Sequence, residues 1–140
     1  ALDEAEKEVP ETLNINDGDK YWYVNGMSNI CWDRYTFTSL RDKAYVRNHR
    51  AFLSEAYAEA FAEKTQFIAD MLHFKYLYDR DYEPDWKNND ESKWYVCYNG
   101  RRYECDTNYT YRNMSVVYFS SEEVAERCAD WLNKRVKENA

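Results

Sequence analysis

Glycine and proline are scarce in this sequence, with 3 and 2 residues among 140. Few residues are therefore left for long irregular loops, because these two residue types dominate turns. No uncharged run approaches the roughly 18–20 apolar residues that a membrane-spanning helix needs. No secretory signal is recognisable, and this favours a cytoplasmic protein.

The short motifs of common active sites are also missing. The sequence contains no Gly-rich phosphate loop, no Gly-x-Ser-x-Gly turn and no His-Glu-x-x-His motif. The two histidines, His49 and His73, show no spacing that suggests a metal site, and the four cysteines match no zinc pattern. We therefore expect a non-enzymatic protein without metal or cofactor. An enzyme with an unrecognised carboxylate or cysteine site is the less favoured alternative.

Positive charge is in deficit, with 19 basic against 26 acidic residues and a net charge of −7. This charge argues against nonspecific binding to nucleic acids or anionic membranes as the main activity, because phosphates and lipid headgroups would be repelled. Hydrophobic residues make up 44% and aromatic residues 18%, which is enough for a packed interior. An acidic protein of this kind more naturally meets a basic protein surface.

One aromatic stretch is present twice. "KYWYVNG" at 20–26 returns as "SKWYVCYNG" at 92–100. Asn-Gly is the strongest short hairpin signal, so each copy predicts two strands joined by a two-residue turn. In the second copy the predicted register pairs Val96 with Tyr103. The residues expected on the core face are Trp94, Val96, Tyr103 and Cys105 in the second copy and Trp22, Val24, Met27 and Cys31 in the first.

Each hairpin is followed by a further predicted strand, at 43–52 and 114–120, and then by a helix. Ser54 is expected to cap the first helix, and either Ser120 or Ser121 the second. Apolar residues at helical spacing predict one buried stripe on each helix. These stripes are Tyr57, Phe61, Ile68, Leu72 and Tyr76 in the first helix and Val124, Cys128, Trp131, Leu132 and Val136 in the second.

The predicted fold class is α+β, built from duplicated βββα units with an antiparallel sheet and two main helices packed on it. We expect one compact domain. Its parts are an acidic N-terminal segment at 1–19, a first unit at 20–78, an acidic connector at 79–92 and a second unit at 93–140. A solvated, frayed terminus is the simpler interpretation of the first nineteen residues.

The aromatic hairpins, the strands ending at Phe52 and Phe119, and the Ser-Glu helix starts resemble small uncharacterised proteins of bacteriophages and prophages. "SSEEVAERCADWLN" is the closer match, whereas the first copy has Ala56-Tyr57 where a second Glu is usual. The resemblance implies a phage or prophage origin and the cytoplasm of a bacterial host. It also implies an accessory role, for example as an anti-CRISPR-like inhibitor of a host defence or nucleic-acid-handling enzyme. It carries no catalytic residues.

Acidic and aromatic residues concentrate in the connector. The simpler interpretation is a solvated linker. The functional alternative is a row of negative charges that meets a basic groove on a host nuclease or defence complex, with aromatic rings as anchors. The candidate partner-binding residues are Tyr82, Glu83, Asp85, Trp86, Asp90 and Glu91.

A second candidate surface combines arginine and tyrosine on a sheet face, where bases of single-stranded nucleic acid would stack. Its residues are Arg47, Arg101, Arg102 and Tyr95. The simpler interpretation is cross-strand pairing of the arginines with acidic neighbours such as Glu104 and Asp106. A homodimer is a further expectation, because each sheet leaves an edge or an aromatic face uncovered.

Overall fold

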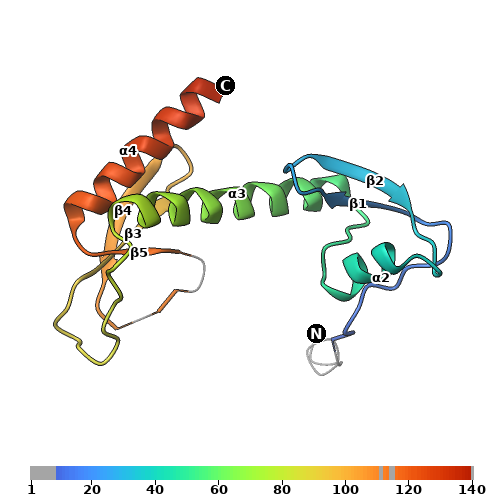
Figure 1. The fold of residues 1–140 in the computed structure, drawn as a ribbon, viewed down its shortest axis with the longest axis horizontal. Helices are drawn as coiled ribbons and strands as arrows, with labels where there is room; N and C mark the ends of the chain where they lie inside the picture. Colours follow the sequence, from blue (N-terminus) through green and yellow to red (C-terminus); the bar gives the residue numbers. More distant parts are fainter. Residues whose placement is uncertain (1–8, 111, 114–115, 140) are drawn as a thin grey trace. The chain divides into compact units, whose positions relative to one another are not determined.

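The computed structural model describes residues 9–110, 112–113 and 116–139. Over these residues the fold class is α+β, with two antiparallel sheets and three helices (Figure 1). The chain divides into two compact units, Ala1–Thr65 and Gln66–Ala140. The division falls within helix α3 (Glu55–Tyr78), so each unit contains one part of this helix.

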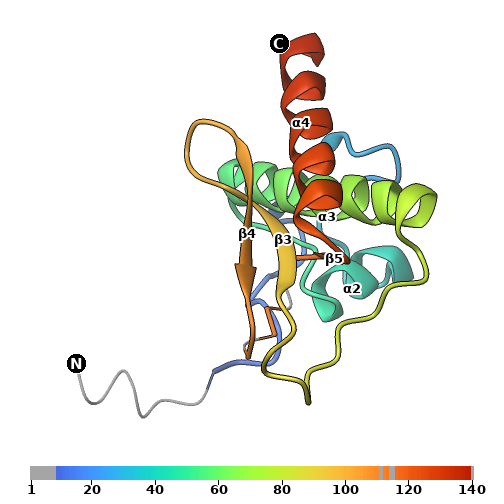
Figure 2. The same cartoon turned by 90° about the vertical axis from the view of Figure 1, so that its left-hand side faces the viewer.

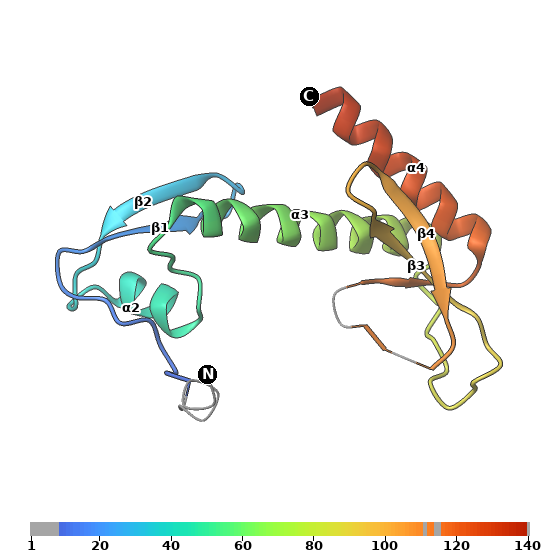
Figure 3. The same cartoon turned by 180° about the vertical axis from the view of Figure 1, so that it is seen from behind.

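The first unit contains a hairpin of β1 (Lys20–Val24) and β2 (Ile30–Arg34), which run side by side in Figure 3. Tyr21 is fully buried and forms a small core with Val46 and Ala51. Tyr23 and Tyr45 pack against this core, their ring centroids 4.8 Å apart. Strand alternation therefore places the odd-numbered residues of β1 on the core side.

The predicted core face of this hairpin is wrong. Trp22 pairs with Trp32 and Cys31 pairs with Tyr23, so Cys31 lies on the opposite face from Trp22. Met27 lies in the turn and is 81% exposed. The reason is the packing of the tyrosines: the buried hydroxyl of Tyr21 donates a hydrogen bond of 2.6 Å to the buried carboxylate of Asp42.

The strand predicted at 43–52 is also wrong over most of its length, because α2 (Leu40–Arg47) occupies 43–47 and the chain turns at 48–51. Ser39 caps this helix and accepts a hydrogen bond from the backbone N–H of Asp42. Only Phe52 pairs as a strand residue. It exchanges two backbone hydrogen bonds with Trp22, of 2.7 and 2.9 Å.

Neither Asn-Gly step forms the predicted two-residue turn. The β1–β2 loop spans 25–29, and its residue with positive φ is Ser28 (63°). The β3–β4 loop spans 99–102, with Gly100 at φ 95°. In both loops the asparagine carboxamide oxygen accepts two backbone N–H groups, which stabilises a longer loop than the sequence predicts.

The second unit contains a sheet of β3 (Lys93–Tyr98), β4 (Tyr103–Asn108) and β5 (Tyr118–Phe119) in the order β4-β3-β5. Helix α4 (Glu122–Asn139) packs on these strands, as Figure 2 shows. The strand predicted at 114–120 is confirmed only as the two-residue β5, because 116–117 and 120 are not in a strand and 114–115 lie outside the described residues. The β3–β4 register differs by two residues from the prediction, so the predicted faces are preserved: Val96 lies opposite Cys105.

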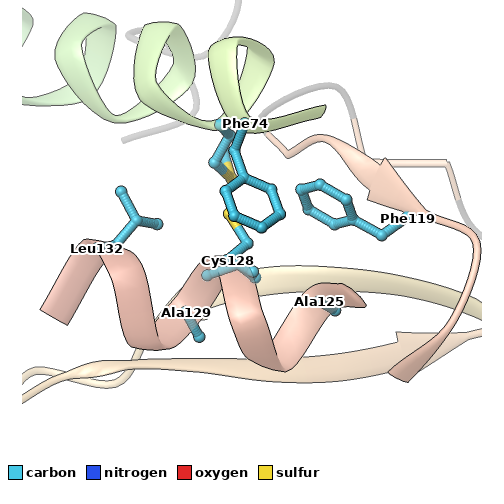
Figure 4. Close-up of a cluster of buried hydrophobic side chains, with 8 residues drawn as sticks. Phe74, Phe119, Ala125, Cys128, Ala129 and Leu132 are labelled. Atoms are coloured by element: carbon cyan, nitrogen blue, oxygen red, sulfur yellow. The ribbon is translucent and has the colours of Figure 1, made fainter. Parts of the chain in front are cut away.

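The core of the second unit lies between α3, α4 and the sheet (Figure 4). It consists of Met71, Phe74, Val96, Phe119, Ala125, Cys128, Ala129 and Leu132. The predicted stripe of α4 is therefore confirmed at Cys128 and Leu132, whereas Val136 is exposed.

The predicted stripe of α3 is less accurate. Tyr57, Leu72 and Tyr76 are exposed, so placing them in the core was wrong. Phe67 and Ile68 pack against the core that contains Met71 and Phe74. The helical period of the apolar residues is confirmed, but nearly every face of this helix carries apolar residues, and the sequence alone could not show which face packs.

The two units share one pairing pattern. Trp22 lies opposite Phe52, and Trp94 lies opposite Phe119. The surroundings of the two tryptophans differ, because the Lys20 ammonium lies over Trp22 whereas Trp94 packs against the core of its unit. With a helix in place of the first unit's third strand, the duplicated βββα repeat is not confirmed.

Candidate partner-binding site

Lys93 fixes the connector to the second unit. Its side chain is completely buried, and its ammonium donates hydrogen bonds to the backbone carbonyls of Asn88 (2.8 Å), Glu91 (3.1 Å) and Tyr109 (2.8 Å). A buried cation with three oxygen partners is well satisfied. The sequence contained no signal for this, because a lysine that begins a strand is usually exposed.

Glu91 and Tyr82 close the connector into a loop. The Tyr82 hydroxyl donates a 2.6 Å hydrogen bond to the Glu91 carboxylate, which also accepts the backbone N–H of Asp85 at 3.3 Å. Burial, and then this hydrogen bond, raise the pKa of Tyr82 well above its usual value. Glu91 is therefore engaged within the chain and shapes the loop, and its contact with a partner stays a prediction.

Helix α3 is joined to the segment before α4. The carboxylate of Asp79 accepts hydrogen bonds from the backbone N–H and the hydroxyl of Ser120, both at 2.7 Å. Ser121, one of the two predicted caps, accepts the N–H of Val124 at the start of α4. Lys75 donates to the carbonyl of Tyr118, and burial lowers the pKa of Lys75.

A row of aromatic rings lies behind the connector. Trp86 meets Tyr118 edge to face, with ring centroids 5.0 Å apart, and Tyr118 meets Tyr95 at 5.8 Å. The Lys93 ammonium lies 5.2 Å from the Trp86 ring. Such contacts hold Trp86 in place at the surface of the second unit.

A hollow of about 390 Å³ opens between the connector and this row of rings. It is lined by Lys75, Tyr82, Glu83, Pro84, Trp86, Arg112, Asn113, Val116 and Tyr118. The structure thus brings together three of the six predicted partner-binding residues, Tyr82, Glu83 and Trp86. Two cations and one carboxylate line the hollow, so a cation is disfavoured inside it, whereas the rings of Tyr82 and Trp86 offer apolar surface.

The connector carries several exposed carboxylates, one of which, Glu83, lines this hollow. Asp81, Glu83, Asp85 and Asp90 are exposed. Within the described part of the chain, none of these carboxylates forms an ion pair. The carboxylate of Asp85 accepts only the nearby backbone N–H of Lys87, at 3.0 Å. We call Tyr82, Glu83, Asp85, Trp86 and Asp90 the connector surface.

The alternative nucleic-acid residues are spread over both units. Arg47 lies in α2 of the first unit, whereas Tyr95 lies on β3 of the second. Arg101 and Arg102 are exposed in the β3–β4 loop. Only the last three share a unit, and stacking of bases on Tyr95 stays a prediction.

Among the described residues, one group of side chains could hold a metal ion. The sulfur of Cys105 on β4 and carboxylate oxygens of Glu122 and Glu126 on α4 all lie within 4.8 Å of one another. Burial, then Glu126 and Glu122, raise the pKa of the Cys105 thiol, so the thiol stays protonated in this environment. Both glutamates are exposed, and exposed carboxylates cluster commonly without a metal; we assign no metal here.

The outer edges of the two sheets differ. On β4, the carboxamide of Asn133 in α4 accepts a hydrogen bond from the N–H of Tyr103 (2.7 Å) and donates one to its carbonyl (2.9 Å). The Asp106 carboxylate accepts the N–H of Thr107. On β2 the backbone groups of Trp32 point outward, because its partner Trp22 uses its own groups to bond Phe52. No described residue bonds them, so β2 is the more open edge.

No helix among the described residues combines the length and the apolar character needed to cross a membrane. Comparison with known proteins found no matching family, no matching curated protein and no matching solved structure. The resemblance to phage-encoded proteins therefore stays a prediction.

Proposed function

We propose that this chain is a non-enzymatic protein-binding module whose connector surface meets a basic surface of its partner. The observation that carries the proposal is the combination of a fixed loop, a hollow and unpaired charge. Lys93 and Glu91 hold the loop in one conformation, so little ordering entropy is lost on binding.

The chemistry of the two parts is complementary. The exposed carboxylates of Glu83, Asp85 and Asp90 would steer a basic surface and fix its orientation. An apolar side chain of the partner would enter the hollow and contact Trp86 and Tyr82. Aromatic anchors surrounded by charged residues are the usual composition of an interface hot spot.

Affinity capture with charge-reversed variants tests the proposal. Wild-type protein on beads should retain a basic bacterial protein that elevated salt releases. The triple variant Glu83→Lys, Asp85→Lys and Asp90→Lys should lose it. Its matched control carries the same charge change on exposed residues of α3, in Glu55→Lys, Glu59→Lys and Glu63→Lys. Equal capture by both triple variants would contradict the proposal.

The finer form of the proposal concerns origin and role. We propose a bacteriophage or prophage protein that acts in the bacterial cytoplasm as an inhibitor of a host nuclease or defence complex. The resemblance to phage-encoded proteins supports it, together with the acidic charge, which suits a groove that normally holds nucleic acid. A gene neighbourhood without phage or defence-related genes would argue against this origin.

A further inference from the structure

A second hollow lies between α3 and α4, within the second unit. Its volume is about 310 Å³. It is lined by His73, Phe74, Leu77 and Tyr78 of α3 and by Arg127, Asp130 and Trp131 of α4. None of these residues belongs to the connector surface. A site here would therefore be independent of the proposed partner contact.

The interior of this hollow is aromatic. Phe74, only 5% exposed, has its ring centroid 5.7 Å from that of Trp131 and 4.8 Å from that of Tyr78. The Trp131 ring also lies 6.1 Å from the imidazole of His73. Rings at these distances offer faces and edges on which a further flat apolar group can pack. Leu77, half-exposed, adds an aliphatic wall.

One guanidinium at the hollow lacks an acidic partner. Arg127 lies over the Tyr78 ring, 5.1 Å from its centroid, and forms no ion pair with any described residue. Asp130 is the competing carboxylate among the lining residues, one helical turn further along α4. Arg135, by contrast, lies over Trp131 and is 3.6 Å from the carboxylate of Asp70.

We propose that the hollow between α3 and α4 binds a flat apolar group that carries a carboxylate. Phe74 and Trp131 already contact each other, so the ring packs against the lining side chains of Trp131 and Leu77 from within the hollow. Its carboxylate accepts hydrogen bonds from the forked donors of Arg127. A free aromatic acid and a peptide that ends in an aromatic residue present the same chemistry. The two sources differ only in the peptide chain that the second one carries in addition to the ring and the carboxylate.

Two probes and one neutral analogue test the proposal in full-length protein labelled with ¹⁵N. Indole-3-propionate and N-acetyl-Gly-Gly-Trp with a free carboxylate are titrated while the indole N–H resonance of Trp131 is followed. A ligand of this size is expected to bind with a Kd on the order of 1 mM. Tighter binding of the peptide would identify a chain terminus as the source, and tighter binding of the free acid a small molecule.

Matched variants isolate the role of the charge. Arg127→Gln should weaken binding about tenfold, as for the loss of one charge-assisted contact. Arg135→Gln, which changes the neighbouring guanidinium that does not line the hollow, should leave binding unchanged. Indole-3-propionamide should bind about as weakly as the acid binds to Arg127→Gln. Equal binding of the amide and the acid, or no shift with either probe at roughly ten times the expected Kd, would overturn the proposal.

Discussion

Substitution of Lys93 by methionine tests whether one buried ammonium holds the connector in place. Methionine keeps most of the apolar stem but removes the three donors to Asn88, Glu91 and Tyr109. Each carbonyl that loses its partner costs about 1 kcal/mol, or about 3 kcal/mol in total. Because burying an ammonium is itself unfavourable, the net loss of stability in the second unit should be about 2 kcal/mol.

Hydrogen exchange is the appropriate assay for Lys93→Met. With two compact units the whole chain need not unfold in one step, whereas amide protection on β3 and β4 reports on the second unit alone. Protection of the connector amides should fall further than that of the strands, because the loop is released first. Lys87→Met, an exposed lysine on the same connector, should change protection by less than about 0.5 kcal/mol. Unchanged protection of the connector in Lys93→Met would refute the reasoning.

Three further predictions concern other parts of the chain. Tyr21→Phe removes a buried hydrogen bond to Asp42 and should cost about 1–2 kcal/mol in urea unfolding. Burial and Asp42 raise the pKa of Tyr21 above its ordinary value of 10.0. The free energy of unfolding should therefore be unchanged below about pH 10 and fall as the pH rises further. This alkaline loss should be smaller in Tyr21→Phe. Burial raises the pKa of the Cys128 thiol to about 12, so under native conditions a disulfide reagent should label the three partly exposed cysteines before the buried Cys128, as mass spectrometry would show. If a homodimer forms, the open β2 edge is where we expect it, and Trp32→Lys should then give monomers in sedimentation experiments.

Local signals of the sequence predicted the fold best. The starts of α3 and α4 could be located to within a residue or two, because a candidate cap and an apolar period lie close together at each. Of the two serines predicted as alternatives for α4, Ser121 is the cap, and the role of Ser54 at α3 stays a prediction. The prediction of which residues share a face of β3 and β4 was correct although the register was wrong by two residues, because side chains on a strand alternate with a period of two. Helix α2 was missed because Tyr45 and Val46 also suit a strand, and the local cap at Ser39 was not recognised. The tertiary contact between Tyr21 and Asp42, which favours the helix further, cannot be seen in the sequence.

The sequence predicted which residues form the candidate site, but not the contacts that hold them in place. The acidic and aromatic residues of the connector could be located from the sequence, and Tyr82, Glu83 and Trp86 do meet at one hollow. The roles of Lys93 and Glu91 could not be predicted, because both depend on partners brought close by folding. Glu91 and Asp90 are neighbours of the same charge, yet one bonds the tyrosine hydroxyl of the loop and the other is exposed.

The unequal strand edges also bear on how the protein behaves when it is concentrated. The Asn133 side chain of α4 occupies the outward backbone groups of Tyr103, so another strand cannot pair with β4 at this residue. In the first unit no described residue covers the backbone groups of Trp32, so we expect edge-to-edge association to begin at β2. A lysine placed there should raise the yield of usable protein and leave the second unit untouched.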